Sequence, residues 1–114
     1  MKREFGKVYL VEAQGTGRYK IGYTTSSIAT RIAQLQTGCP DRIVETASHV
    51  TSIPSMLEMA MHNVLRNKCV GGEWFELTAE DVAGFKALCE KMETNIKLVM
   101  ENNTYYQDKR NKRF

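Results

Sequence analysis

The sequence lacks the features that mark membrane and secreted proteins. No apolar run approaches the roughly 20 residues that a membrane-spanning helix needs. No signal-peptide pattern opens the chain, and it contains no internal repeat. We therefore expect a soluble, intracellular protein in the cytoplasm, with no membrane partner.

Cysteine is also scarce. The chain has three, Cys39, Cys69 and Cys89, and none belongs to a Cys-x-x-Cys pair. An odd number at wide spacing argues against a disulfide framework and against a zinc ribbon. We expect reduced thiols, with Cys89 in the core, since free cysteine is among the most buried residue types.

The composition fits one small globular domain of 114 residues, with 42% hydrophobic and 25% charged residues. The net charge of +3 is unevenly distributed. Residues 1–68 hold nine Lys/Arg against five Asp/Glu, residues 69–107 hold three against seven, and residues 108–114 hold four against one. Basic charge in the first half and at the end favours a polyanionic partner.

Periodicity predicts an α+β fold. We expect a small, mainly antiparallel three-stranded sheet flanked by helices, plus a long C-terminal helix. Strands are predicted over residues 6–11, 19–23 and 42–50, and helices over 26–37, from Pro54 to about 68, and over 79–102. Residues 73–77 read as a short strand or an extended segment. The predicted parts are a core (1–78), a helix packing on it (79–103) and a basic flexible tail (104–114).

The helix spacing separates polar from apolar side chains. Arg31 lies off the apolar stripe of the first helix and is free to face a ligand. Glu58, His62 and Arg66 follow at i, i+4 and i+8 and should share one face of the second helix. The stripe of the last helix extends to Val99, and an overhanging end would suit a homodimer contact.

The order of several motifs is more specific than any one of them. They are Tyr9 on the first strand, Ile21-Gly22-Tyr23-Thr24 ending the second, Arg31 followed by Gln34-Leu35-Gln36-Thr37-Gly38, Glu58 with His62, and Gly72-Glu73-Trp74-Phe75-Glu76-Leu77. This order resembles the GIY-YIG nuclease superfamily, in particular its phage and fungal DNA-binding branch with segments of the form YKIGYT, R…QLQTG, E…H and GEWFEL. The resemblance covers residues 7–78.

The resemblance implies a DNA endonuclease that hydrolyses phosphodiester bonds with one divalent metal, Mg²⁺ or Mn²⁺. It implies that Tyr9 helps to activate the attacking water, that Arg31 binds the scissile phosphate and that Glu58 holds the metal. These roles suit the chemistry, because a cation and a guanidinium both stabilise the charge that gathers on the phosphate. Hard cations such as Mg²⁺ often take only one or two protein carboxylates.

Two departures leave alternatives open. Lys7 stands where the first motif has Gly, and Lys20 stands where the second has Tyr. Lys20 could assist a hydroxide, act on phosphate, or mark lost catalysis. His62 could be a second ligand, a proton relay or a partner of Glu58 on the helix face. Glu73 and Glu76 are interpreted as structural, and the two aromatics between them as core.

Three functions follow as hypotheses: a metal-dependent endonuclease, a non-cleaving DNA-binding module of the same fold, and a phage or regulatory protein that binds a partner through its last helix. The candidate catalytic residues are Tyr9, Lys20, Arg31, Glu58 and His62. The candidate DNA-binding residues are Lys20, Arg31, Arg66, Lys109, Arg110, Lys112 and Arg113.

Overall fold

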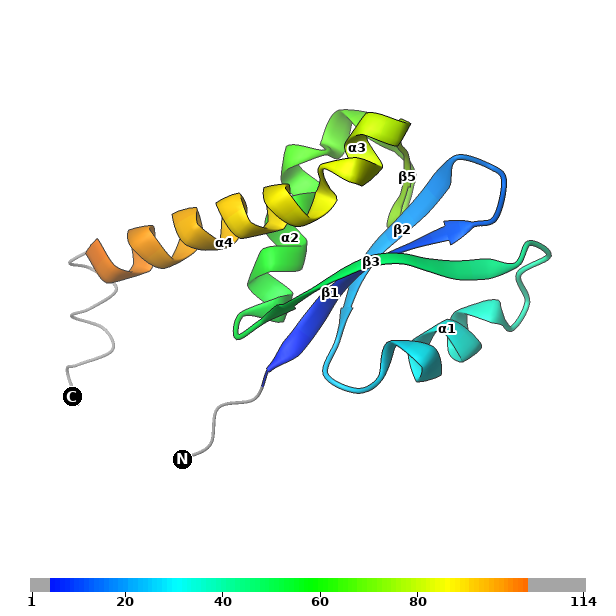
Figure 1. Ribbon diagram of the computed structural model, residues 1–114, viewed down its shortest axis with the longest axis horizontal. Helices are drawn as coiled ribbons and strands as arrows, with labels where there is room; N and C mark the ends of the chain where they lie inside the picture. Colours follow the sequence, from blue (N-terminus) through cyan, green and yellow to red (C-terminus); the bar gives the residue numbers. More distant parts are fainter. Residues whose placement is uncertain (1–4, 103–114) are drawn as a thin grey trace.

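The computed structural model describes residues 5–102 as an α+β fold (Figure 1). The elements run β1 (Gly6–Ala13), β2 (Arg18–Thr24), α1 (Ile28–Gln36), β3 (Ile43–Thr51), α2 (Pro54–Val64), the 3-10 turn η1 (Arg66–Lys68), β4 (Cys69–Gly71), β5 (Trp74–Glu76), α3 (Ala79–Ala83) and α4 (Phe85–Asn102).

The sheet has five strands in the order β3-β1-β2-β5-β4, with every neighbouring pair antiparallel. The prediction of three strands is therefore wrong. Strands β4 and β5 have three residues each, which is too short for an alternating pattern to appear in the sequence. Pairing with Arg18–Lys20 of β2 makes β5 a strand, and that contact is long-range.

Glycines shape the β1–β2 hairpin. Gly15 and Gly17 have φ of 79° and 76°, the left-handed region that other residues rarely adopt. The hairpin sets the register that pairs Tyr9 with Gly22 and Val11 with Lys20. Because paired residues in an antiparallel sheet point to the same face, all four lie on one side.

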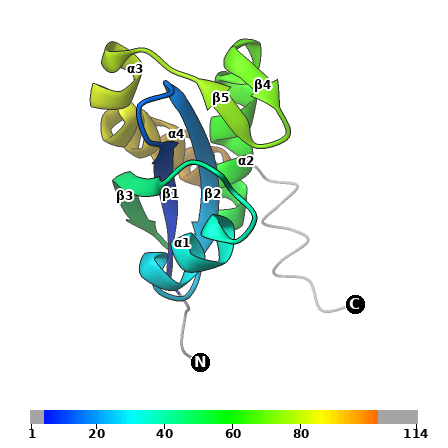
Figure 2. The same ribbon diagram turned by 90° about the vertical axis from the view of Figure 1, so that its right-hand side faces the viewer.

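Helices cover both faces of the sheet (Figures 1 and 2). On one face, Val8, Leu10 and Ile21 pack with α2 and α4. On the other face, α1 covers a smaller cluster, and Trp74 packs against it. Residues of that second cluster are Tyr9, Val11, Ala13, Ile28 and Ile43. Tyr9 therefore lies on the opposite face of β1 from Val8 and Leu10.

The long helix predicted over 79–102 is interrupted at Gly84, which separates α3 from α4. Thr78 caps α3: its side chain accepts from the Asp81 backbone N–H, and the Asp81 carboxylate accepts from the Thr78 backbone N–H. Cys89 of α4 is fully buried, and the three cysteines are free, as expected.

A polar cluster ties α4 to the edge strand β3. One Glu93 carboxylate oxygen lies 2.7 Å from His49 Nε2, and the other accepts from the Thr51 hydroxyl at 2.7 Å and lies 3.3 Å from Lys97 Nζ. Burial works to raise the pKa of Glu93, but the hydrogen bonds from His49, Thr51 and Lys97 together lower it below the ordinary value.

The distal half of α4 extends past the sheet (Figure 1). The Cα radius of gyration is 15.8 Å, against about 13 Å for a compact domain of this length. Leu98 and Val99 on this segment are about half exposed, at 49% and 56%. Nothing in the structure or in the comparisons supports the predicted homodimer.

Within residues 5–102, no helix is both long enough and apolar enough to cross a membrane. The predicted tail residues Lys109, Arg110, Lys112 and Arg113 lie outside the described range.

Candidate active site

The candidate site lies at the point along β2 where its pairing with β5 ends. Strand β5 pairs with β2 only as far as Lys20. Just beyond, the Ile21 N–H donates to the Glu73 carbonyl at 3.3 Å, and the Ile21 carbonyl accepts from His62 Nε2 at 2.8 Å. Side chains from both faces of the sheet can therefore meet at this gap.

Tyr9 and Arg31 form the first part of the site. Arg31 Nε donates to the Tyr9 hydroxyl at 3.3 Å, and Arg31 Nη1 donates to Gln34 Oε1 at 3.0 Å. The hydrogen bond to Tyr9 is the main cause that raises the pKa of Arg31, and the charge of Glu73 contributes. The phenol ring lies across Gly22, where a Cβ atom would stand 2.6 Å from Tyr9 Cζ. Gly22 is thus needed for space.

Glu58 and His62 form the second part. They are one turn apart on α2, with Glu58 Oε2 3.5 Å from His62 Nε2. Burial raises the pKa of Glu58; Glu73 raises it further, while His62 and Lys20 act in the opposite direction. Because a carbonyl only accepts, Nε2 of His62 carries the proton that it shares with Ile21. His62 also packs edge-on against Phe75, with the ring centroids 5.0 Å apart.

Lys20 and Glu73 complete the group. Lys20 is buried, and its Nζ is hydrogen-bonded to Glu73 Oε1. Glu73 lies in the turn between β4 and β5 and is half exposed. The charge of Glu73 contributes to the raised pKa of both Arg31 and Glu58, so this carboxylate acts on both parts of the site.

We call these six side chains the edge cluster: Tyr9, Lys20, Arg31, Glu58, His62 and Glu73. They come from β1, β2, α1, α2 and the β4–β5 turn. Two cations, two carboxylates and a phenol at one gap can bind a phosphate and a small cation side by side.

A polar hollow of about 310 Å³ lies on the far side of Arg31. It is lined by Tyr23, Thr24, Thr25, Ser26, Arg31 and Gln34. Among residues 5–102, the third guanidinium nitrogen, Nη2, has no hydrogen-bond partner. The hollow therefore offers hydroxyls and a free guanidinium edge, which suit phosphate oxygens.

The donor set fits a hard divalent cation held by few protein ligands. No three His, Cys, Asp or Glu side chains within residues 5–102 are grouped to hold a metal. Mg²⁺ commonly needs only one or two carboxylates, with water filling the other positions. Glu58 is the candidate ligand, because no Lys or Arg within residues 5–102 forms an ion pair with its carboxylate, whereas Glu73 is paired with Lys20.

The structure brings together all five predicted catalytic residues. Arg66 is exposed in η1, and no described contact joins it to the edge cluster. Sequence reasoning missed Glu73, whose place depends on β5 joining the sheet. The GEWFEL segment was the available signal, but Glu73 was interpreted as structural.

No curated protein and no solved structure matched the chain. The family model of the T5orf172 domain matches residues 6–93. This finding corrects the assignment to the GIY-YIG superfamily, for which no family model matched. The T5orf172 domain is associated with nuclease-like or DNA-binding functions, which gives a DNA-acting role in general. The chain therefore belongs to the T5orf172 domain family.

Proposed function

We propose that the edge cluster hydrolyses phosphodiester bonds of DNA with the help of a divalent cation. The observation that carries the proposal is the Arg31–Tyr9 hydrogen bond beside two carboxylates at a single sheet edge. A guanidinium and a phenol are thereby placed next to the groups that can hold a cation.

Each residue has a distinct role in this proposal. Arg31 binds the scissile phosphate through its free Nη2 edge. Tyr9 accepts from Arg31 with one lone pair, so its second lone pair can orient a water molecule toward phosphorus. Glu58 holds Mg²⁺ or Mn²⁺, which when bound would supply positive charge to the phosphate.

Lys20 and His62 support the other groups. The ammonium of Lys20 pairs with the Glu73 carboxylate. This pairing offsets the negative charge of Glu73, which acts on Glu58. His62 anchors the free edge of β2 through Ile21 and keeps Glu58 turned toward the cluster. We assign His62 a positioning role, because Nε2 is already engaged.

A nicking assay tests the proposal on supercoiled and branched DNA with Mg²⁺ or Mn²⁺. Arg31→Met and Glu58→Gln should each lose at least about 100-fold in rate, the scale of one electrostatic contact in a transition state. Arg42→Met and Glu45→Gln are matched controls on exposed positions outside the edge cluster, and both should cleave normally. Equal activity in all five proteins would refute the proposal.

Metal binding has a readout that does not depend on cleavage. Mg²⁺ should raise the melting temperature of the wild type and of Glu45→Gln, and it should not raise that of Glu58→Gln. An equal increase of the melting temperature in all three proteins would mean that the cation binds away from Glu58.

A non-cleaving DNA-binding module is the second candidate. The Lys20–Glu73 ion pair favours it, because a carboxylate already paired with an ammonium is a poorer cation ligand. In that case DNA binding would be salt-sensitive and independent of metal, and no DNA would be nicked with either cation.

A further inference from the structure

A groove leads from the edge cluster along the face of the sheet that carries α1. Its volume is about 550 Å³, within the range of about 300–1,000 Å³ typical of ligand pockets. One wall comes from β2 and the β4–β5 hairpin, and the other from the end of α1 and the loop before β3. Lys20 belongs both to this groove and to the edge cluster.

Trp74 provides an aromatic surface in the groove. It pairs with Lys20 across the β2–β5 ladder, and its side chain is only partly buried. The sequence interpretation of Trp74 as core is thus only half of its role, since one part packs on the α1 side and another lines the groove. An exposed indole face is a stacking platform for a base of any identity.

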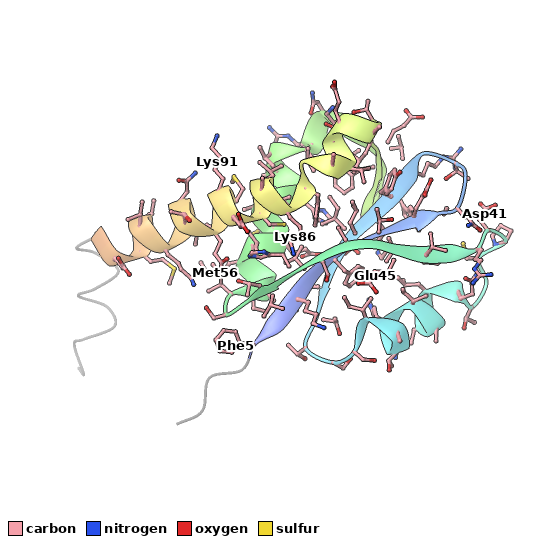
Figure 3. The ribbon with its side chains drawn as sticks, viewed as in Figure 1. Phe5, Asp41, Glu45, Met56, Lys86 and Lys91 are labelled. Atoms are coloured by element: carbon pink, nitrogen blue, oxygen red, sulfur yellow. The ribbon has the colours of Figure 1, made fainter. Side chains whose placement is uncertain are left out.

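The facing wall suits a flat, apolar group. Leu35, Cys39 and Pro40 lie on it, with the Thr37–Gly38 backbone between them. Arg18 is exposed on the wall opposite, and Asp41, which Figure 3 shows at the far tip of the molecule, also lines the groove. Phosphates would therefore favour the Arg18 and Lys20 side, and a neutral base would favour the Trp74 side.

We propose that this groove holds an unpaired nucleotide of the DNA substrate, its base stacked on Trp74 and its backbone beside Lys20, the residue that the groove shares with the edge cluster. The proposal rests on the proposed function and specifies its substrate class: DNA with unpaired nucleotides at the cleavage site. A base within a duplex cannot enter such a groove unless it leaves the helical stack.

The fluorescence of Trp74 tests this directly, because the chain has one tryptophan. The probes are a 12-nucleotide oligothymidylate, a fully paired duplex of equal length, and heparin as a polyanion without bases. Once binding is saturated, oligothymidylate should quench the Trp74 emission. The fluorescence anisotropy of a labelled oligonucleotide shows when saturation has been reached. The duplex and heparin should leave the emission unchanged. The proposal would be overturned if heparin quenched the emission as much as oligothymidylate does. It would also be overturned if saturating oligothymidylate caused no quenching.

Substitutions give a second readout. Trp74→Leu should weaken oligothymidylate binding about 5- to 150-fold, the equivalent of one stacked base, and leave duplex binding unchanged. Trp74→Phe keeps an aromatic ring and should stay within about threefold of wild type. If Trp74→Leu fails to fold, the fluorescence titration of the wild type and the oligothymidylate affinity of Trp74→Phe test the proposal instead. Equal loss for both DNA forms would contradict a base-stacking role.

The two proposals fail in different ways. Wild-type protein that nicks paired DNA without quenching would refute the groove proposal and leave the cleavage proposal standing. Quenching by oligothymidylate with no cleavage under either cation would refute the cleavage proposal alone. Glu58→Gln should still show full quenching, because Glu58 does not line the groove.

Discussion

At the scale of single residues, Gly22 decides where the Tyr9 hydroxyl can lie. The ring passes over position 22, so any side chain there must displace it. Gly22→Ala should destabilise the fold by about 1–3 kcal/mol, the usual cost of overpacking, and reduce any nicking activity. Gly84→Ala is the control, since its nearest neighbour would be an ordinary 3.4 Å away. Urea unfolding and the nicking assay measure both effects; a Gly22→Ala protein as stable as Gly84→Ala would contradict the packing argument.

The carboxylate of Glu58 should weaken the fold at neutral pH. Its pKa is raised in the folded state, mainly by burial, so the native protein holds this proton more tightly than the unfolded chain. Stability contributed by the protonated form is then lost as pH rises through and above the ordinary glutamate range. Glu58→Gln should therefore be more stable than wild type at pH 7 and equally stable near pH 3.5, as measured by urea unfolding. A Glu58→Gln protein less stable at pH 7 would refute this reading.

Sequence patterns located most of the candidate site. Helical spacing separated Arg31 from the apolar stripe of its helix, and the i, i+4 relation joined Glu58 to His62. The position of Glu73 could not be derived in this way. Its contact with Lys20 spans 53 residues of sequence and depends on a strand of three residues.

At the scale of elements, one partly buried carboxylate adds a polar tie between α4 and β3 to the apolar packing of Phe85 and Cys89. Glu93 has its pKa lowered by hydrogen bonds from His49, Thr51 and Lys97, which outweigh its burial. Its contribution to stability is present above the ordinary glutamate pKa and is lost as pH falls through the lowered value. Glu93→Ala should cost about 1–3 kcal/mol at pH 7, and the difference should shrink near pH 3. Glu90 is an exposed neighbour on α4, so Glu90→Ala should reduce the free energy of unfolding only slightly. Equal losses of stability in the two variants would argue against a stabilising role for the Glu93 hydrogen bonds.

Elements with strong periodicity were predicted well, and short ones were not. The first three strands and the first helix appeared close to their predicted bounds. The additional strands β4 and β5 were not counted, because three residues carry no usable alternation. The division of the last helix at Gly84 was also missed, since the apolar spacing continues from Val82 to Phe85 across it.

At the scale of the whole molecule, charge is divided between regions. Figure 3 shows Lys86 and Lys91 on α4, on the face of the sheet opposite α1. Residues 69–107 carry more acidic than basic side chains, but α4 itself is balanced, with three basic and three acidic side chains. We expect DNA to contact the α1 side together with the basic C-terminal residues and to gain little from α4, which has no net charge.

Paired charge removals test this arrangement. Lys109→Gln with Arg110→Gln should lower the dependence of log affinity on log salt by about 2, one for each lost phosphate contact. Lys86→Gln with Lys91→Gln removes the same charge and should leave the salt slope unchanged. Binding isotherms on one duplex at several salt concentrations give both slopes, and a larger effect from the α4 pair would reverse the predicted orientation.

The close fit between the Tyr9 ring and Gly22 has a consequence for the evolution of the T5orf172 family. Since a side chain at position 22 and a ring at position 9 would claim the same volume, the two positions should not vary independently. Relatives with an aromatic residue at position 9 should have glycine at position 22, and relatives with a larger residue at 22 should have lost the aromatic ring, and with it the support for Arg31. Such paired changes would identify the family members that no longer have the Tyr9–Arg31 part of the site.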